Sequence, residues 1–317
     1  MTPDEHWTLW RRDPRATAFQ SPAWIEAWWR ELGGGERIDV AARGSDGALI
    51  GAMPMTVWHD EGVRRLIPVA AGQSDYSDAL VDPALAGEAL AGLWRGIDAA
   101  GDRWDEVLLP DLRPDSPLLG PVPDAWIAAD EPGEVCPVLA LPAEGDVLAA
   151  MSRSRRRKIV HDHNRADALG GVDTRLVEGA AAIDEALAAL FRLHGERWAR
   201  EGQAGVLAEE RVQRFLAAAA HALAAAGLLR LVVVRHDGRI VAVLLGFADD
   251  RRGMSYINGV DMSVAGQSFG TLAFRQLIDR VHHDGASAFH FLRGEEAYKY
   301  GWGAVPIRTV RRTIRRR

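Results

Sequence analysis

The sequence predicts a mixed α/β (α+β) protein of two tandem domains, each a mixed, largely antiparallel sheet flanked by helices. A chain of 317 residues is long for one hydrophobic core and suits two domains of ordinary size. Helical and alternating apolar patterns follow one another in both halves, with glycine turns between them. Because the first half repeats the element order of the second in shorter form, the pattern indicates a diverged internal duplication.

In the first half, a helix precedes three strands, and a second helix leads into a fourth strand. Helical spacing of apolar residues predicts the helices, and turns at 46–47 and 60–62 separate the strands. The expected ranges are 22–32 (helix), 38–42, 49–58 and 63–69 (strands), 83–100 (helix) and 105–109 (strand). A Pro- and Gly-rich stretch over 113–133 marks the junction, so we expect domains at 1–134 and 135–317.

The second half is predicted as strand, two helices, three antiparallel strands, helix, strand, loop and strand. Asp184 and Glu185 favour the start of the first helix, and Asp237-Gly238 is a strong hairpin signal. The expected ranges are 172–177 (strand), 183–200 and 209–226 (helices), 228–235, 239–248 and 254–260 (strands), 271–283 (helix), 288–292 and 305–314 (strands). An arginine-rich helix that ends at Gly170-Gly171 precedes them.

The composition excludes several classes of protein. Hydrophobic content of 48% and charged content of 26% are typical of a soluble globular chain. The start has no apolar signal segment, and the longest weakly polar run, 215–229, is too short for a bilayer. The single cysteine, Cys136, excludes an intrachain disulfide, so we expect a cytoplasmic protein. A net charge of −6 argues against general nucleic-acid binding.

The segment 289–304 joins a short strand to a loop rich in ionisable and aromatic groups. Tyr298, Tyr300 and Trp302 lie close together there, and Lys299 is one of only two lysines in the chain. Loops of this kind carry a site on a rigid scaffold, or they fold their aromatic rings beneath the last strand. Composition alone leaves both interpretations open.

The same segment resembles the closing signature of a bacterial acetyltransferase family. Its pattern is Phe-Leu-Arg-Gly-x-Glu-x-Tyr-Lys-x-x-Trp-Gly-Ala, over 291–304. Other motifs follow in the order of that family: 74–78, 136–139, Leu193-His194-x-x-Arg197-Trp198, Asp237-Gly238 and 259–261. The family is the CelD-like (cellulose biosynthesis) group of the GNAT superfamily, and the tandem halves resemble Fem-type peptidoglycan aminoacyl ligases. The resemblance covers nearly the whole chain and implies an active second domain and a degenerate first one.

This resemblance implies an acyltransferase, and an N-acetyltransferase in particular. Such an enzyme moves an acyl group from acetyl-CoA or another acyl-CoA to an amine by direct attack, and it needs no metal. The implied acceptor is a small-molecule or sugar-linked amine. Two alternatives remain open: aminoacyl transfer from charged tRNA, the one case in which we expect nucleic-acid binding, and a non-catalytic accessory role in polysaccharide biosynthesis.

The cofactor is expected at the end of one strand and on the loop that follows it. Backbone N–H groups of the loop 266–271 can bind phosphate beside the positive end of a helix, although an ordinary helix cap explains the same residues. Leu272 departs from the GNAT pattern, where a small residue belongs. The loop also matches Gly-x-Ser-x-Gly, the nucleophile elbow of serine hydrolases, with Asp279, His282, His283 and Asp284 after it. The expected cofactor-binding residues are Asn258, Gly259, Val260, Gly266, Gln267, Ser268, Phe269, Gly270 and Thr271.

Acyl transfer also needs an acid and a base. The family resemblance implies Tyr298 as the acid that protonates the leaving thiolate. Glu295 and Asp75 are the candidate bases, with Asp261 as a third, although for any single one a solvated loop acid is the simpler explanation. A carboxylate base would need burial to raise its pKa towards neutrality.

The acceptor is expected near the aromatic loop and at the loop 74–78, whose acids suit a cationic amine and which we expect to face the cleft between the two domains. A polar turn with a solvated Asp78 explains the same loop. The expected substrate-binding residues are Tyr76, Asp78, Arg156, Trp198, Arg293, Lys299 and Trp302. Arg156 belongs to a basic run, 153–158. We prefer to interpret this run as a solvated helix face. The second interpretation is a surface for an anionic acceptor such as a nucleotide sugar, and the third is a tRNA site. His161 and His163 lie on different helix faces, so we expect no metal site.

Overall fold

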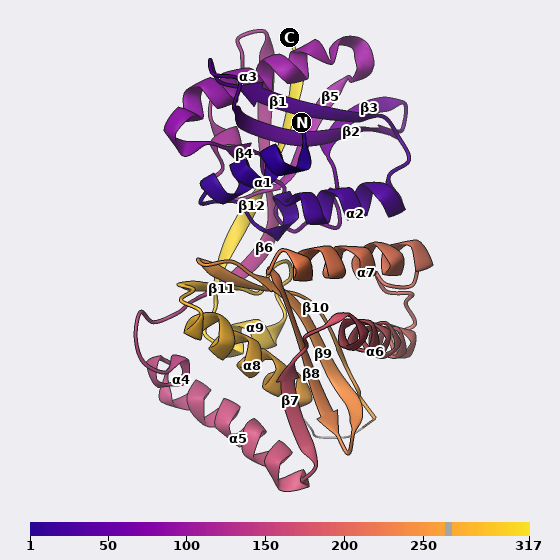
Figure 1. Cartoon of the computed structure of the whole chain (residues 1–317), viewed down its shortest axis with the longest axis vertical. Helices are drawn as coiled ribbons and strands as arrows, with labels where there is room; N and C mark the ends of the chain where they lie inside the picture. Colours follow the sequence, from indigo (N-terminus) through magenta and orange to yellow (C-terminus); the bar gives the residue numbers. More distant parts are fainter. Residues whose placement is uncertain (264–267) are drawn as a thin grey trace. The chain divides into compact units, whose positions relative to one another are not determined.

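The computed structural model describes residues 1–263 and 268–317, and it confirms the predicted mixed α/β fold with mostly antiparallel strands (Figure 1). The chain divides into two compact units. Unit 1 contains Met1–Val135 and Ile307–Arg317, and unit 2 contains Cys136–Pro306. The predicted second domain, 135–317, extended to the last residue, whereas the segment after Pro306 belongs to unit 1.

Unit 1 is built on strands in the order β1-β2-β3-β5-β12-β6, with β4 paired to β2. The first three strands form an antiparallel meander, β3 and β5 are parallel, and β12 is antiparallel to β5. Its elements are α1 (Pro3–Arg12), η1 (Ala18–Gln20), α2 (Pro22–Leu32), β1 (Arg37–Arg43), β2 (Leu49–Asp60), β3 (Val63–Pro68), β4 (Leu80–Val81), η2 (Pro83–Leu85), α3 (Ala86–Ala99), η3 (Gly101–Arg103), β5 (Glu106–Leu112), η4 (Pro117–Leu119), the first part of β6 (Trp126–Ala140) and most of β12 (Val305–Arg316).

Helix α1 is an element that the sequence analysis missed. Thr2 and Glu5 form a capping box, and Pro3 opens the first turn, so local signals for a helix are present. The helix buries only His6 and Leu9. Such a narrow buried face is hidden in a segment that is otherwise polar and charged.

Unit 2 continues the pattern with strands in the order β6-β11-β10-β9-β8-β7. Strands β7 to β10 form an antiparallel meander, and β10 pairs in parallel with β11. Its elements are α4 (Val147–Ala150), α5 (Arg153–Leu169), β7 (Val172–Leu176), α6 (Ala180–Arg200), α7 (Glu210–Ala225), β8 (Leu229–His236), β9 (Arg239–Ala248), β10 (Arg252–Val260), α8 (Phe269–His283), β11 (Ala288–His290) and α9 (Ala297–Gly301).

The last strand of the chain pairs with a different unit from the one we expected. We expected 305–314 to complete the second domain, but β12 pairs with β5 of unit 1 instead. In unit 2, the end of β6 lies beside β11. The side chains of β12 explain why this strand pairs within unit 1, because Ile314 is fully buried in the apolar core of that unit. Arg312 is also buried, and it binds Asp130 at 2.6 Å and the carbonyl oxygens of 118–120.

Candidate active site

A β-bulge in β10 decides which side chains face the candidate site. The register between β10 and β9 shifts inside the strand, which adds one residue to β10. Before the shift, a side chain at Gly253 would meet Val281 of α8 at 2.7 Å. After the shift, a side chain at Gly259 would meet Leu193 of α6 at 2.9 Å. Two residues six positions apart share a face on a regular strand, so the bulge turns the far half of β10 over.

This turn aims Asn258 and Val260 towards the side of the sheet that α8 covers, opposite α6 (Figure 1). Strand β10 also extends beyond its parallel neighbour. Its pairing with β11 covers Arg252 to Met254, whereas its pairing with β9 continues to Val260. Along the described chain, one edge of the far half of β10 is therefore open, and backbone N–H groups there can serve a ligand.

A cavity of about 580 Å³ lies at this open edge in unit 2. Its walls come from β10, the first turn of α8, α9 and the end of α6. The volume falls within the range of small-molecule sites, about 300 to 1,000 Å³. Seven predicted residues line it: Asn258, Val260, Ser268, Gly270, Thr271, Tyr298 and Trp302. Gly266 and Gln267 lie outside the described residues.

Five further lining residues were missed: Arg197, Arg200, Glu201, Met262 and Phe274. The first three lie in the last turn of α6 or just after it, at a spacing of three and four residues that puts them on one helix face. That spacing is visible in the sequence. Nothing in the sequence, however, shows that this helix end faces a cavity, because the proximity to β10 is a tertiary contact.

Aromatic rings form one wall of the cavity. The ring centroid of Phe274 lies 5.2 Å from that of Tyr298 and 6.4 Å from that of Trp302. Trp302 is 4% exposed and Tyr298 is 40% exposed. The segment expected to be a loop contains the short helix α9, which places Tyr298 at the cavity while Lys299 and Trp302 are buried. The segment therefore buries part of its aromatic surface, and its role as a site stays a prediction.

Burial raises the pKa of the Tyr298 phenol, and the negative charge of Glu296 adds to this shift, whereas a hydrogen bond with the Asn258 side chain opposes it. The phenol therefore keeps its proton at physiological pH, as an ordinary tyrosine does, and burial makes it a weaker acid than usual. A neutral acid at the open edge of a strand is what protonation of a leaving group requires.

Lys299 does not face the cavity, although we expected it to bind substrate. Its side chain is 3% exposed, and its Nζ atom donates to the carbonyl oxygens of Leu292, Arg293 and Gly294 at 3.1, 2.6 and 3.1 Å. It also pairs with Glu296 at 2.9 Å. All donors of an ammonium group are thereby used, so Lys299 holds the turn before α9.

Three other residues near the predicted cofactor site serve packing. Gly259 lets α6 approach, since a Cβ there would lie 3.2 Å from the carbonyl oxygen of Leu190. Phe269 is fully buried in the core of unit 2. Leu272, which departs from the GNAT pattern, is also in that core at 4% exposure and does not line the cavity. The large side chain at position 272 therefore leaves the cavity open.

The predicted bases of unit 2 do not line the cavity. Glu295 is exposed, and the Tyr300 hydroxyl lies 3.4 Å from its carboxylate. Asp261 is 4% exposed and pairs with Arg239 at 3.1 Å. Burial raises the pKa of Asp261, but hydrogen bonds from Ser263 and the charge of Arg239 outweigh that effect and hold the pKa below its usual range. Asp261 therefore stays ionised and serves the turn after β10.

The remaining substrate-binding predictions in unit 2 also lie outside the lining. The indole N–H of Trp198 donates a hydrogen bond of 2.9 Å to His194, and the guanidinium of Arg197 lies over the Trp198 ring. Arg156 is exposed on α5, and Arg293 is half-buried. Trp198 thus supports Arg197, which does line the cavity.

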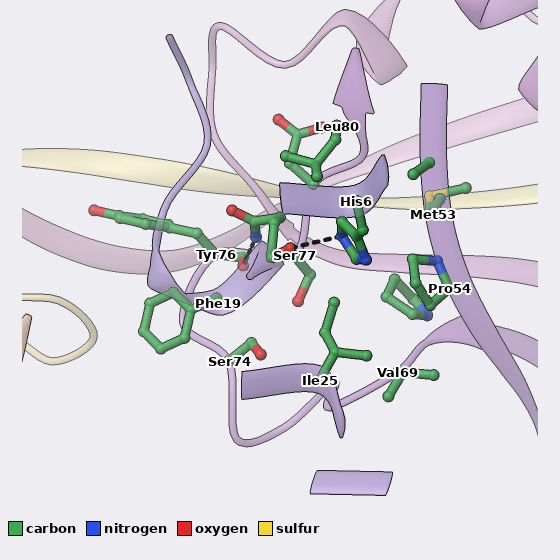
Figure 2. A pocket seen from close by; sticks show the side chains of 14 residues that line it. His6, Phe19, Ile25, Met53, Pro54, Val69, Ser74, Tyr76, Ser77 and Leu80 are labelled. Atoms are coloured by element: carbon green, nitrogen blue, oxygen red, sulfur yellow. Dashed lines mark hydrogen bonds between the residues drawn. The ribbon is translucent and has the colours of Figure 1, made fainter. Parts of the chain in front are cut away.

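In unit 1, the loop 74–78 is packed inward (Figure 2). Tyr76 is 1% exposed, and its carbonyl oxygen accepts a hydrogen bond of 2.7 Å from Gln20. The space beside Tyr76 and Asp78 is about 20 Å³, which is room for about one water molecule. Within unit 1 this loop encloses no room for an acceptor, and the acceptor site predicted between the domains at Asp75, Tyr76 and Asp78 stays a prediction.

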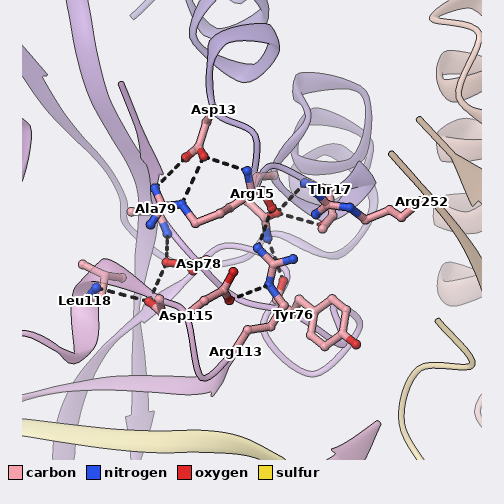
Figure 3. Close-up of polar contacts among 12 residues, drawn as sticks. Asp13, Arg15, Thr17, Tyr76, Asp78, Ala79, Arg113, Asp115, Leu118 and Arg252 are labelled. Carbon is pink, nitrogen blue, oxygen red and sulfur yellow. Dashed lines mark hydrogen bonds and ion pairs between the residues drawn. The ribbon is translucent and has the colours of Figure 1, made fainter. Parts of the chain in front are cut away.

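Asp78 is part of a polar network instead (Figure 3). Its Oδ1 atom accepts hydrogen bonds from Ser116 Oγ and from the backbone N–H of Ala79, both at 2.9 Å. Its Oδ2 atom is buried and has no hydrogen-bond partner among the described residues. Burial raises the pKa of Asp78 to about 6, against the opposing charge of Arg113.

The serine-hydrolase alternative is not supported by this arrangement. Ser268 precedes the first residue of α8, whereas His282 lies near its end and points to the carbonyl oxygen of Pro142 at 2.9 Å. His282 follows Ser268 by fourteen positions along the helix, which places the two residues about 20 Å apart. In the described ranges, 1–263 and 268–317, no three His, Cys, Asp or Glu side chains gather as a metal site requires. Within the same ranges, none of the helices has both the length and the apolar character of a membrane span.

Comparison with known proteins identifies the part of the chain that carries the cavity. Residues 153–300 match the acetyltransferase (GNAT) domain. This range contains every lining residue except Trp302. The match is to the superfamily domain, and the narrower CelD-like resemblance remains a prediction. No curated protein matches the chain.

Solved structures agree with the predicted tandem GNAT-like fold over the whole chain. FemX is similar with a TM-score of 0.67 and 12% identity, over 98% of this chain and 96% of FemX. L-PGS from Bacillus licheniformis is similar with a TM-score of 0.59 and 12% identity, over 93% of this chain and 92% of L-PGS. A tandem GNAT protein from the clavulanic acid biosynthesis pathway is similar with a TM-score of 0.50 and 14% identity, over 99% of this chain and 93% of that protein. At such identities the similarity shows the fold and not the substrate.

Proposed function

We propose that this chain is an acyl-CoA-dependent N-acyltransferase whose active site is the cavity of unit 2. The observation that carries the proposal is the neutral phenol of Tyr298 beside the open edge of β10. An acyl thioester placed along that edge would have its carbonyl oxygen near backbone N–H donors and its sulfur near an acid. Those are the two groups that acyl transfer needs for the oxyanion and for the leaving thiolate.

In the proposed step, the acceptor first loses one ammonium proton to solvent or to a base. The amine nitrogen then forms a bond to the thioester carbonyl carbon, while backbone N–H groups of the open edge of β10 stabilise the oxyanion. The C–S bond breaks, and the thiolate takes the proton of Tyr298. The second proton leaves the attacking nitrogen and restores the phenol, so the products are an amide, a free thiol and one released proton.

The anionic part of the cofactor would lie at the start of α8 and towards α5. Phe269 and Gly270 open the first turn of α8, where the first backbone N–H groups have no partner inside the helix, whereas the N–H of Thr271 already donates to the carbonyl oxygen of Ser268 at 2.8 Å. Helix α5 lies nearby, because Thr271 donates to Asp162 at 3.4 Å and a side chain at Gly303 would meet the Arg155 guanidinium at 3.3 Å. Exposed cations therefore flank the proposed phosphate site.

The two units support an active second half and a degenerate first one. Each unit has a meander followed by a parallel strand pair. Where the last meander strand ends, the cavity of about 580 Å³ in unit 2 compares with about 20 Å³ in unit 1, whose hollow of about 400 Å³ lies at the start of that strand instead. A space that holds one water molecule cannot accept a thioester.

Aminoacyl transfer from charged tRNA is the second candidate. It is favoured by the first two turns of α5, where Arg153, Arg155, Arg156, Arg157 and Lys158 are all exposed. Among the described residues none of these five side chains forms an ion pair. A surface of this charge would attract the phosphates of an RNA, and the binding would weaken steeply with salt.

Calorimetric titration with acetyl-, malonyl- and palmitoyl-CoA tests the proposal, using the wild type, Gly270→Glu and Gly270→Ala. A Cβ at Gly270 would lie 3.4 Å from Val260, an ordinary contact, so the alanine variant serves as the matched control. We expect saturable binding that the glutamate variant loses and the alanine variant keeps. The proposal is wrong if millimolar thioester does not bind the wild type, and salt-sensitive binding of charged tRNA would then favour the second candidate.

A further inference from the structure

The charged side chains that line the cavity come from one place, the last turn of α6 and the residue after it. They are Arg197, Arg200 and Glu201. The remaining described walls are aromatic, aliphatic or uncharged polar, with Val260, Phe274 and Trp302 prominent among them. A ligand in this cavity therefore meets both signs of charge, from one short segment, together with apolar surface.

An ordinary explanation for Arg197 and Arg200 is that cations favour the negative end of a helix. That explanation does not require the side chains to face a cavity, and it does not account for the carboxylate beside them. Arg197 pairs with Glu201 at 3.4 Å, a long contact between two exposed groups. Arg200 is exposed, and no described residue forms an ion pair with it.

We infer that the acceptor is a small molecule that carries both the reacting amine and an anionic group, a carboxylate or a phosphate. This inference rests on the proposed function and specifies its substrate class. Arg200, joined by Arg197, would bind the anionic group through charge-assisted hydrogen bonds. Glu201 would accept hydrogen bonds from the ammonium group and so hold the nitrogen inside the cavity that Tyr298 lines.

The pair between Arg197 and Glu201 fits this arrangement. An acceptor that carries both charges can replace each partner of the pair with a group of the same sign. Neither residue is then left without a counter-charge when the acceptor is bound. An amine without an anionic group would satisfy Glu201 alone and would offer no counter-charge to either arginine.

Thiol release from acetyl-CoA tests the inference with two matched pairs of acceptors, glycine with glycinamide and O-phosphoethanolamine with ethanolamine. We expect kcat/KM for the anionic member to exceed that for its neutral partner by at least about tenfold in one pair. The preferred pair distinguishes a carboxylate from a phosphate. Arg200→Gln should remove most of the preference and Arg200→Lys should keep part of it. The control Arg214→Gln, which breaks an exposed ion pair with Glu210 on α7, should leave the preference for the anionic acceptor unchanged.

Equal kcat/KM within both pairs would overturn the inference, and so would a preference that survives in the Arg197→Gln/Arg200→Gln double variant. Ligand-detected NMR separates this result from a failure of the proposed function, because it needs no acyl donor. Binding of O-phosphoethanolamine or glycine that is lost in the double variant supports the acceptor site even if no thioester is consumed. Signals of equal strength for the neutral partners contradict it.

Discussion

The ammonium group of Lys299 donates a hydrogen bond of 2.6 Å to the carbonyl oxygen of Arg293. The same group binds the carbonyl oxygens on either side, and one of them belongs to Leu292, whose φ is 57°. That left-handed conformation is rare for a leucine and stores strain. Lys299 therefore closes a strained turn between β11 and α9, and this turn fixes where α9 presents Tyr298 to the cavity.

Replacement of this lysine should destabilise unit 2. In Lys299→Met the side chain keeps its length, but three carbonyl oxygens lose their buried donor. We expect the free energy of unfolding to fall by about 2 to 4 kcal/mol. Urea denaturation measures this change. The matched control is Lys158→Met, at the other, exposed lysine of the chain, which should change the stability by less than about 0.5 kcal/mol. Equal stability of the two variants would show that Lys299 does not hold the turn.

Two glycines of unit 2 should respond to alanine in opposite directions. At Gly259 a Cβ would lie 2.9 Å from the Cβ of Leu193, so Gly259→Ala should force α6 away and reduce stability by about 1 to 3 kcal/mol. Gly195 lies in the exposed part of α6 with nothing within 4 Å of its Cβ position, so Gly195→Ala should stabilise by about 0.5 to 1 kcal/mol. Chemical denaturation of both variants measures whether the free energy of unfolding rises or falls in each. A neutral Gly259→Ala would mean that α6 does not pack closely on β10.

Periodicity and turn residues were sufficient for most of the fold. The helix predicted at 22–32 is α2, and the strands predicted at 49–58 and 239–248 correspond to β2 and β9. These elements carry a local signal, a cap or a hairpin glycine, that agrees with their tertiary environment. The strand at 305–314 was also recognised, but its partner was not, because the alternation of buried residues does not say which sheet buries them.

The site was predictable where a motif had a local cause. Gly270, Thr271 and Tyr298 line the cavity, and all three belong to recognisable segments. The role of Lys299 was not predictable, because its partners are backbone carbonyl oxygens, which have no sequence signature. Gly259 shows the same limit: the need for close approach is visible as a glycine, but the element that approaches is not.

Removal of the Tyr298 hydroxyl should affect the chemistry far more than the fold. Tyr298→Phe keeps the ring contacts with Phe274 and Phe291, so we expect little change in stability. Loss of a general acid should lower kcat by about 100-fold or more, while the KM for the thioester changes little. Tyr300→Phe is the matched control, because Tyr300 does not line the cavity, and its kcat should stay near that of the wild type. Steady-state thiol release measures both. A Tyr298→Phe enzyme as fast as the wild type would exclude the phenol as the acid.

Two buried groups of unit 1 should give stability contributions of opposite sign in mildly acidic solution. Burial lowers the pKa of His6 to about 4, below its usual 6.5, although the carbonyl oxygen of Gln20 and the charges of Glu26 and Asp39 favour protonation. Between these values the unfolded state binds the extra proton, so the His6 contribution to stability falls as the pH drops. Asp78 behaves oppositely, because its pKa rises from 3.8 to about 6 on folding and the folded state then binds the extra proton.

Asp78→Asn should therefore expose the slope that His6 alone produces. Asparagine keeps an acceptor for Ser116 and Ala79 but does not titrate, so the stability of this variant should rise more steeply between about pH 4 and pH 6 than that of the wild type. The difference across that window should be about 1 to 3 kcal/mol, corresponding to a shift of about two pKa units. His6→Gln should show the opposite deviation. Urea midpoints at several pH values measure both, and carboxylates common to all three proteins cancel in the comparison. Parallel pH profiles for wild type and Asp78→Asn would show that the Asp78 carboxyl group is solvated.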